Sequence, residues 1–159
     1  MRYKKLAFSA QIVVLITIGI VAPISADITG NPRIIDGDTI EIVGQRIRLP
    51  GIDAPESGQS CEAPGKAWQG GQEAGFALAK MIGRTGVACD ERDKDRYGRI
   101  VAVCRVGGLK GKDLNGAMVG EGWALAYREY SQDYVELEGV AKAAGKGLWR
   151  GRFIPPWEW

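Results

Sequence analysis

Four carboxylates and one arginine crowd a short, otherwise apolar part of the sequence. Within "IDGDTIEI" and "RIRLPGIDAPE", acids stand at Asp36, Asp38, Asp53 and Glu56, and Arg48 interrupts an apolar strand pattern. Carboxylates repel one another, so gathering them is unfavourable unless a cation lies between them. Two carboxylates with a backbone carbonyl and water form the oxygen ligand set that suits Ca²⁺ or Mg²⁺. We therefore predict a site for a hard divalent cation.

The local sequence distinguishes an acid that a turn explains from one that a turn does not explain. Asp36-Gly37 is a dipeptide typical of hairpin turns, so the ordinary interpretation of Asp36 is a turn residue. Asp38 stands where the strand pattern resumes, and a turn alone does not explain it. Pro55 disfavours helix at Ala54, which leaves the Ala54 carbonyl available as a ligand.

Two arginines, Arg48 and Arg99, admit two interpretations. A strand or turn arginine most often belongs to a solvated face, because charged side chains are seldom buried. Beside a cation site, however, two guanidiniums also suit an anionic phosphoryl group, since they pair with phosphate oxygens bidentately and stay charged.

Composition excludes several other chemistries. The 159 residues include no histidine, which rules out Ser–His and Cys–His nucleophile systems and the zinc sites that depend on histidine. Residues 93–104 begin like an EF-hand calcium loop, but Tyr97 and Cys104 stand where that loop needs oxygen ligands. We reject an EF-hand.

The first 26 residues differ from the rest. Three basic residues precede an apolar run at 12–21 and a small-residue exit, "PISAD", a pattern typical of a secretory signal peptide. The run is shorter than the roughly 20 residues of a membrane-spanning helix, although an uncleaved anchor is the alternative. We expect cleavage after Ala26, export to the medium or a periplasm, and a single domain over 27–159.

Net charge gives no argument for a nucleic-acid partner. The chain has 21 basic and 19 acidic residues, and removing the three basic residues of the signal segment leaves 18 against 19, or −1. Any such argument has to come from where individual charges lie.

Apolar periodicity predicts short strands with helices between them. Alternation over 33–56 predicts strands with turns at 36–37 and 43–45, and 55–66 has the composition of a loop. Residues 85–91 and 99–106 predict a long hairpin around "RDKDRYG". A return strand to Tyr127 completes the set. Such an arrangement suggests a small β-barrel with attached helices, of which the OB-like barrel is one form.

Three helices are predicted. Helical spacing of apolar residues indicates one over 72–84. Asp113 would cap a second, ending at 120 or 122, and Ser131 would cap a third that runs to about 145. The predicted inner face of the third helix consists of Val135, Val140, Ala141 and Ala144.

Four segments, in this order and with matching spacing, resemble the thermonuclease (staphylococcal-nuclease-like) family, in its secreted bacterial form. They are "IDGDTIEI", "RIRLPGIDAPE", "DRYGR" and "LNGAMVGEGWALAY", and the similarity covers roughly residues 33 to 150. The resemblance implies an α+β fold, a five-stranded OB-fold β-barrel with three helices. It also implies a calcium-dependent phosphodiesterase that acts on DNA and RNA.

The resemblance implies a role for each matched residue. The calcium ligands would be Asp38, Asp53 and the backbone carbonyl of Ala54, with Asp36 lying behind them. The residues acting in catalysis would be the general base Glu56 and the phosphate-clamping Arg48 and Arg99. The residues contacting the nucleotide would be Arg96, Tyr97 and Tyr127.

The implied reaction is attack of water on phosphorus with loss of the 5′ oxygen, which leaves a 3′-phosphate. The substrate would be single-stranded or frayed DNA and RNA, with no stable protein partner and no membrane contact after signal cleavage. The alternative is a catalytically silent OB-type module that binds nucleic acid or protein. Presence of all the acids and arginines of the site favours the enzyme.

The three cysteines are an odd number for an exported chain. Cys89 and Cys104 are symmetric about the hairpin turn, which sets them opposite each other on adjacent strands, within disulfide reach. Two buried free thiols are the alternative, but export favours the bridge. Secreted relatives often carry a further cysteine where this chain has Gly70. Cys61 would then be free or link two molecules.

Overall fold

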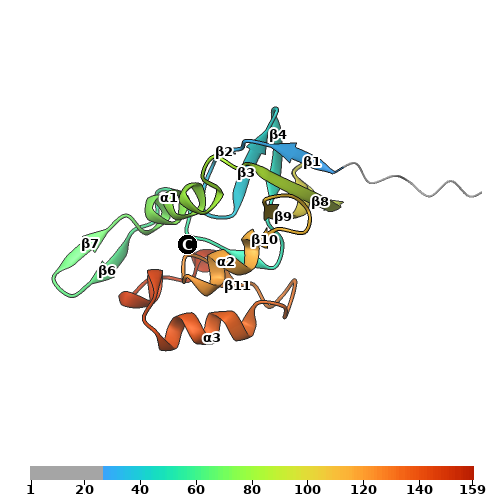
Figure 1. Cartoon of the computed structure of the whole chain (residues 1–159). Coiled ribbons are helices and arrows are strands. Elements are labelled where there is room, and N and C mark those ends of the chain that lie inside the picture. Colours follow the sequence, from blue (N-terminus) through green and yellow to red (C-terminus); the bar gives the residue numbers. More distant parts are fainter. Residues whose placement is uncertain (1–26) are drawn as a thin grey trace, which may run out of the picture.

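The computed structural model describes residues 27–159, and Figure 1 shows the arrangement of their elements. The predicted signal segment, residues 1–26, lies outside the described residues. The main sheet has seven strands, in the order β1-β8-β9-β4-β3-β2 with β10 beside β9. They are β1 (Ile28–Gly30), β2 (Arg33–Ile34), β3 (Thr39–Ile42), β4 (Gln45–Arg48), β8 (Val87–Lys94), β9 (Ile100–Val106) and β10 (Lys112–Asp113).

Strand pairing in this sheet is antiparallel except between β4 and β9, which run parallel. Among the described residues, no pairing joins β1 to β2, so the seven strands form an open path rather than a closed five-stranded barrel. The predicted mixed α+β class is confirmed.

Two small sheets complete the strands. One joins β5 (Ile52–Asp53) to β11 (Leu125–Ala126), and the other is a hairpin of β6 (Cys61–Ala63) and β7 (Lys66–Trp68). The prediction that 55–66 is a loop was therefore wrong in part. Its Pro-Gly pair makes the two-residue turn of this hairpin, with Gly65 at φ 77°. Strands of three residues are too short to show alternation in the sequence.

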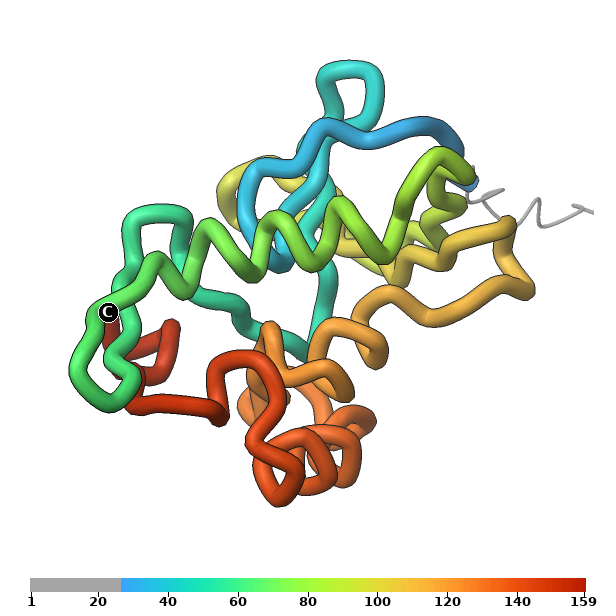
Figure 2. Tube along the Cα trace, turned by 60° about the vertical axis from the view of Figure 1, so that its left-hand side comes forward, coloured from blue at the N-terminus to red at the C-terminus, as the bar shows by residue number. Residues whose placement is uncertain are grey.

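The three predicted helices are present as α1 (Gly70–Ile82), α2 (Leu114–Gly120) and α3 (Val135–Ala143). Short 3-10 turns follow at Gly147–Arg150 and Pro156–Glu158. Helix α1 begins two residues before the predicted start, and its buried residues Ala74, Leu78 and Ile82 recur at the helical spacing from which it was predicted. Asp113 caps α2 as predicted, accepting a hydrogen bond from the Asn115 amide at 3.0 Å. Figure 2 shows α1 passing between the blue N-terminal strands and the red C-terminal segment.

The start of the third helix was predicted wrongly. Ser131 does not cap it: its hydroxyl accepts a hydrogen bond from the Asp133 amide (3.0 Å) in a turn that precedes α3. Two members of the predicted inner face are also wrong, since Val140 is 64% exposed and Ala144 is exposed.

Buried Glu138 takes that place on the inner face of α3. Its carboxylate accepts a hydrogen bond from the Ala126 amide of β11 (2.9 Å) and pairs with Arg128. The buried face of α3 therefore differs from the predicted one and includes a polar contact to β11, which an apolar periodicity cannot reveal.

The core fills the space between the main sheet and the helices. Its largest fully buried side chains include Ile40, Ile42, Ile47, Leu49, Ile52, Leu78, Leu114 and Met118. The alternation predicted for 33–56 supplies four of these, Ile40, Ile42, Ile47 and Leu49, each worth about 1.5–3 kcal/mol of transfer free energy when buried. Within the described part of the chain, every helix is too short or too polar to span a bilayer.

The predicted bridge between Cys89 and Cys104 is confirmed. The two residues are direct partners in the register of β8 and β9, and their sulfurs are bonded. Cys61 is buried and unpaired within the described chain, as predicted. A Cβ at Gly70 would lie 2.3 Å from the Cys61 sulfur, so the thiol lies directly against this glycine.

Candidate functional site

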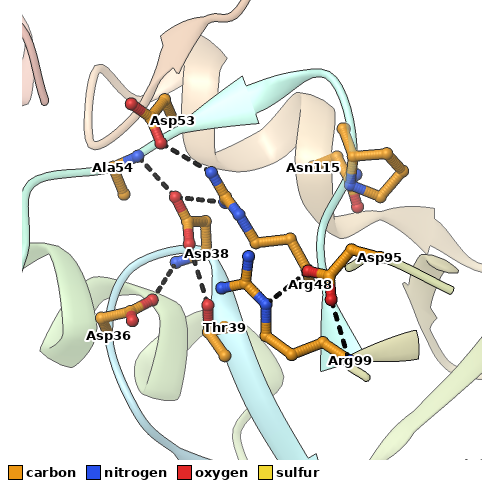
Figure 3. Close-up of polar contacts among 10 residues, drawn as sticks. Asp36, Asp38, Thr39, Arg48, Asp53, Ala54, Asp95, Arg99 and Asn115 are labelled. Carbon is orange, nitrogen blue, oxygen red and sulfur yellow. Dashed lines mark hydrogen bonds and ion pairs between the residues drawn. The ribbon is translucent and has the colours of Figure 1, made fainter. Parts of the chain in front are cut away.

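Three strand ends bring two carboxylates onto one guanidinium, as Figure 3 shows. Arg48, the last residue of β4, donates a hydrogen bond through Nη2 to Asp53 Oδ1 at 2.6 Å. Its Nη1 forms an ion pair with Asp38 Oδ2. The register of β3 and β4 sets Arg48 opposite Thr39, directly beside Asp38. The predicted convergence of Asp38, Asp53 and Arg48 is therefore observed.

Asp38 is the most restrained carboxylate of the site. Oδ2 accepts a hydrogen bond from the Ala54 amide (2.7 Å), and Oδ1 accepts one from the Thr39 hydroxyl (3.1 Å). Its own amide donates to Asp36 Oδ1 at 2.9 Å. Asp36 is thus a turn residue that also lies behind Asp38, which reconciles its two interpretations.

Positive charge is scarce in this cluster. Burial raises the pKa of the Asp38 carboxyl to about 8, although the Arg48 guanidinium opposes the shift. Burial likewise raises the pKa of Asp53, again against the effect of Arg48. One guanidinium serves three neighbouring carboxylates, counting Asp36, so the cluster can accommodate additional positive charge.

Glu56 has an exposed side chain near the same cluster. Among residues 27–159, no hydrogen bond or ion pair to its carboxylate is recorded. The neighbouring protein partly shields the Glu56 carboxyl from water, which raises its pKa, and the carboxylates of Asp36 and Asp53 raise it further, while Arg48 and Arg99 act in the opposite direction. Glu56 thus carries a carboxylate of increased basicity that is free to act on a ligand.

The backbone under Glu56 is held by its contact with α1. A Cβ at Gly71 would lie 1.7 Å from the Glu56 carbonyl oxygen, a separation that atoms cannot adopt. We expect Gly71→Ala to force the Glu56 loop away from α1 and to lower the free energy of unfolding by about 1–3 kcal/mol, the usual effect of overpacking. Urea unfolding followed by circular dichroism measures the difference.

Gly75 provides the matched control on the same helix. A Cβ there meets nothing closer than 3.8 Å, and alanine is the better helix former by about 1 kcal/mol. Gly75→Ala should therefore stabilise the protein. Equal losses in both variants would mean that the helix does not tolerate alanine and that the Glu56 contact is not the cause.

Arg99 is paired with a residue that sequence reasoning did not single out. Its Nε donates to Asp95 Oδ2 at 2.6 Å, while Asp95 Oδ1 accepts from the amides of Tyr97 (2.9 Å) and Arg99 (3.0 Å). Burial works to raise the pKa of Asp95, but these hydrogen bonds from Arg99 and Tyr97 outweigh it and hold that pKa below its usual value. The sequence does contain a pattern that points to Asp95, because aspartate is favoured at the first position of a turn such as "DRYG".

An open groove of about 440 Å³ lies beside the cluster and joins these groups. It brings together five of the predicted site residues, namely Arg48, Arg96, Tyr97, Arg99 and Tyr127. The Arg96 guanidinium lies 4.9 Å from the centre of the Tyr97 ring, which is itself well exposed. Tyr130 also lines the groove, and sequence reasoning missed it because nothing in its surroundings marks it.

The groove can bind an anion that carries an aromatic group. Guanidiniums pair with phosphate oxygens, and tyrosine rings stack on nucleobases. Arg48 belongs both to the groove and to the carboxylate cluster. A phosphate bound by Arg48 would therefore lie close to Asp38 and Asp53.

No metal cluster accompanies these carboxylates in the described range, 27–159, where no three or more His, Cys, Asp or Glu side chains are placed to hold an ion. The predicted set of Asp38, Asp53 and the Ala54 carbonyl thus stays a prediction. Its chemistry fits Ca²⁺, because the donors are hard oxygens and both carboxylates already share one cation, the Arg48 guanidinium.

Comparison with known proteins places the chain in a family. Residues 46–151 match the staphylococcal nuclease homologue family. Protein ParB of Escherichia coli is 35% identical, with 99% of this chain and 91% of that protein aligned. Micrococcal nuclease of Shigella flexneri is 34% identical over 96% of this chain and 90% of its own length. An uncharacterized endonuclease of Escherichia coli is 36% identical over 84% of this chain and 86% of its own length. The chain belongs to the staphylococcal nuclease family.

Proposed function

We propose that this protein is a calcium-dependent nuclease that hydrolyses phosphodiester bonds in DNA and RNA. One observation carries the proposal: Arg48 is held between Asp38 and Asp53 at the edge of a groove that Arg99 and Tyr127 also line. That arrangement supplies phosphate recognition, carboxylates and a base-stacking ring within one site. The names of the relatives, a micrococcal nuclease and an endonuclease, support the same activity.

The two guanidiniums would bind the scissile phosphate. Each is now paired with carboxylate, Arg48 with Asp38 and Asp53, and Arg99 with Asp95. A phosphate would compete with these carboxylates for the same donors. Because the carboxylates pre-orient the guanidiniums, little reorganisation is needed when negative charge grows on the phosphoryl oxygens.

Calcium would be held by Asp38, Asp53 and the carbonyl of Ala54. The shortage of positive charge around these carboxylates supports the assignment, and calcium would compete with the Arg48 guanidinium for them. When bound, the ion supplies charge that polarises a phosphoryl oxygen. The amide of Ala54 keeps Asp38 in place through its 2.7 Å hydrogen bond.

Glu56 would accept the proton of the attacking water. Its exposed carboxylate and raised pKa suit a general base, since a base works best when its pKa approaches the operating pH. The water oxygen would form a bond to phosphorus as the bond to the 5′ oxygen breaks. The departing 5′ oxygen would take a proton from solvent to become a hydroxyl, and the other product would keep a 3′-phosphate. Arg96, Tyr97 and Tyr127 would bind the flanking nucleotide, with Tyr127 stacking on a base.

The remaining expectations belong to the same proposal. We infer that residues 1–26 are a signal peptide, that the exported protein works outside the cell or in a periplasm, and that 27–159 form one domain. We also infer that the strands correspond to the OB-type barrel of the family. In this chain the two end strands of the sheet, β1 and β2, are not paired with each other. Single-stranded or frayed nucleic acid is the expected substrate, because stacked and paired bases cannot reach the tyrosine rings.

Release of acid-soluble nucleotides from heat-denatured DNA tests the proposal. With Ca²⁺ present we expect steady release, which should fall to background when a chelator is added and return when Ca²⁺ is restored. Circular dichroism before and after chelation serves as the folding control. If folded protein in Ca²⁺ releases nothing but still binds DNA, the chain is an OB-type binding module instead.

A further inference from the structure

The C-terminal tail, residues 152–159, reaches back to the groove. Trp157 stacks on Tyr127, with ring centres 5.4 Å apart and ring planes only 8° from parallel. Tyr127 lines the groove and Trp157 does not, so the stacked pair links the groove wall to the C-terminal tail. Tyr130 packs edge-on against the same tyrosine at 4.8 Å.

The tail is anchored at two points before Trp157. Arg152 and Glu62 exchange two backbone hydrogen bonds, of 2.6 and 2.8 Å, which tie the tail to the β6–β7 hairpin. Figure 2 shows the red tail beside that green hairpin. The fully buried side chain of Gln59 donates to the Ile154 carbonyl at 2.7 Å. Both anchors precede the tryptophan.

Two prolines then stiffen the path to Trp157. Pro155 has φ −51° and ψ 137°, and Pro156 begins the final 3-10 turn, which is closed by a hydrogen bond from the Glu158 amide to the Pro155 carbonyl (2.9 Å). Proline fixes φ, so this segment has few alternative conformations. A tail that served only to cover the core would not need to present an indole face to a half-buried loop tyrosine.

We propose that Trp157 is a positioning residue for Tyr127. Its indole stacks on the Tyr127 ring and so fixes the orientation of that ring in the groove wall, where a nucleobase would stack on it. Pre-setting the ring removes the ordering that binding would otherwise require. The stacking of a nucleobase on Tyr127 rests on the proposed function. The contact between the rings of Trp157 and Tyr127 is independent of that function.

Steady-state kinetics on short single-stranded oligonucleotides test the inference. Trp157→Ala should raise KM by about 2- to 12-fold, the range expected for loss of one aromatic pair, with kcat changed less than about 2-fold, since the residue touches no reacting atom. Trp157→Phe keeps a stacking ring and should restore most of the affinity.

Trp159→Ala is the matched control. Trp159 is the same residue type on the same tail, is 62% exposed and has no recorded ring contact with Tyr127. It should leave KM unchanged. If Trp159→Ala raises KM as much as Trp157→Ala, any disturbance of the tail weakens substrate binding, and the specific positioning role of Trp157 is wrong.

A double-mutant comparison separates positioning from direct binding. In a Tyr127→Ala background, Trp157→Ala should have no further effect on KM, because its only route to the substrate is through the missing ring. Additive effects would overturn the proposal by showing that Trp157 acts on its own.

Oligonucleotide binding in chelator, followed by tryptophan fluorescence, gives a readout that does not need turnover. If the wild type binds here but also fails to cleave the oligonucleotide once Ca²⁺ is supplied, the proposed function fails while the positioning of Tyr127 remains testable by the same variants. Equal affinity of wild type and Trp157→Ala in this assay would refute the positioning role, whatever the activity.

Discussion

Replacing Arg48 with alanine should lower kcat for DNA hydrolysis by about 10³-fold, the usual effect of removing a group that stabilises transition-state charge. Arg48 is the one side chain shared by the carboxylate cluster and the groove. Without it, the phosphoryl oxygens lose a bidentate donor, and the acids around it lose their nearest cation. Initial rates at saturating substrate measure the loss.

The same substitution should also destabilise the calcium-free protein. Asp38 is almost fully buried, and the Arg48 side chain is only 17% exposed. At a pH above about 8, where the Asp38 carboxyl is ionised, removing its ion-pair partner should cost about 3–5 kcal/mol, because the remaining charge is buried without a counter-ion. If Asp38 and Asp53 hold Ca²⁺, adding the ion should restore stability to Arg48→Ala more than to the wild type, as measured by thermal unfolding with and without calcium.

Arg46 provides the matched control for both effects. It lies two residues earlier on the same strand, but its side chain is exposed and lies outside the groove. Arg46→Ala should leave kcat and stability nearly unchanged. Arg48→Ala with wild-type turnover would show that the guanidinium is a structural counter-ion to the two carboxylates and has no role in phosphate binding.

Removal of the Cys89–Cys104 bridge should produce the largest change in stability away from the site. The bridge closes a loop with a sequence separation of 15 residues, for which the constraint on the unfolded chain is worth about 3 kcal/mol. A Cys89→Ala, Cys104→Ala variant should therefore unfold about 10 °C below the oxidised wild type. Differential scanning calorimetry without reductant measures the shift.

Cys61→Ala controls for the loss of a buried sulfur. Cys61 is 1% exposed and unpaired in the described chain, so its replacement removes packing but no crosslink. We expect a smaller loss, about 1 kcal/mol, and a melting temperature that still falls when reductant is added. The double variant should be insensitive to reductant; continued sensitivity would mean that the bridge contributes little.

Local interactions made much of this fold predictable. The turn at Asp36, the alternation of Ile40 and Ile42, and the cap at Asp113 each depend on residues within a few positions along the chain. The Cys89–Cys104 pair was predictable for a similar reason, because the two strands of a hairpin share one turn, and the bulge between Glu91 and Asp93 shifts their register by only one position.

Helix α3 marks the limit of such reasoning. An apolar pattern indicated Val140 as an inner residue, but the structure exposes it and buries Glu138 instead. The reason is a hydrogen bond to the Ala126 amide in a different element. A buried carboxylate with its partners is favourable only in that tertiary setting, and the sequence around it does not reveal the partner.

The sequence by itself determined which groups are available for chemistry: acids and arginines at fixed spacing, no histidine, and Tyr97 in the "DRYG" turn. Only the tertiary structure decided that Arg48 lies between Asp38 and Asp53, and that Trp157 packs on Tyr127 from 30 positions away. Those contacts join separate strands and the chain end. They form because burial and packing, which act between distant segments, select the one arrangement that satisfies these charges and rings together.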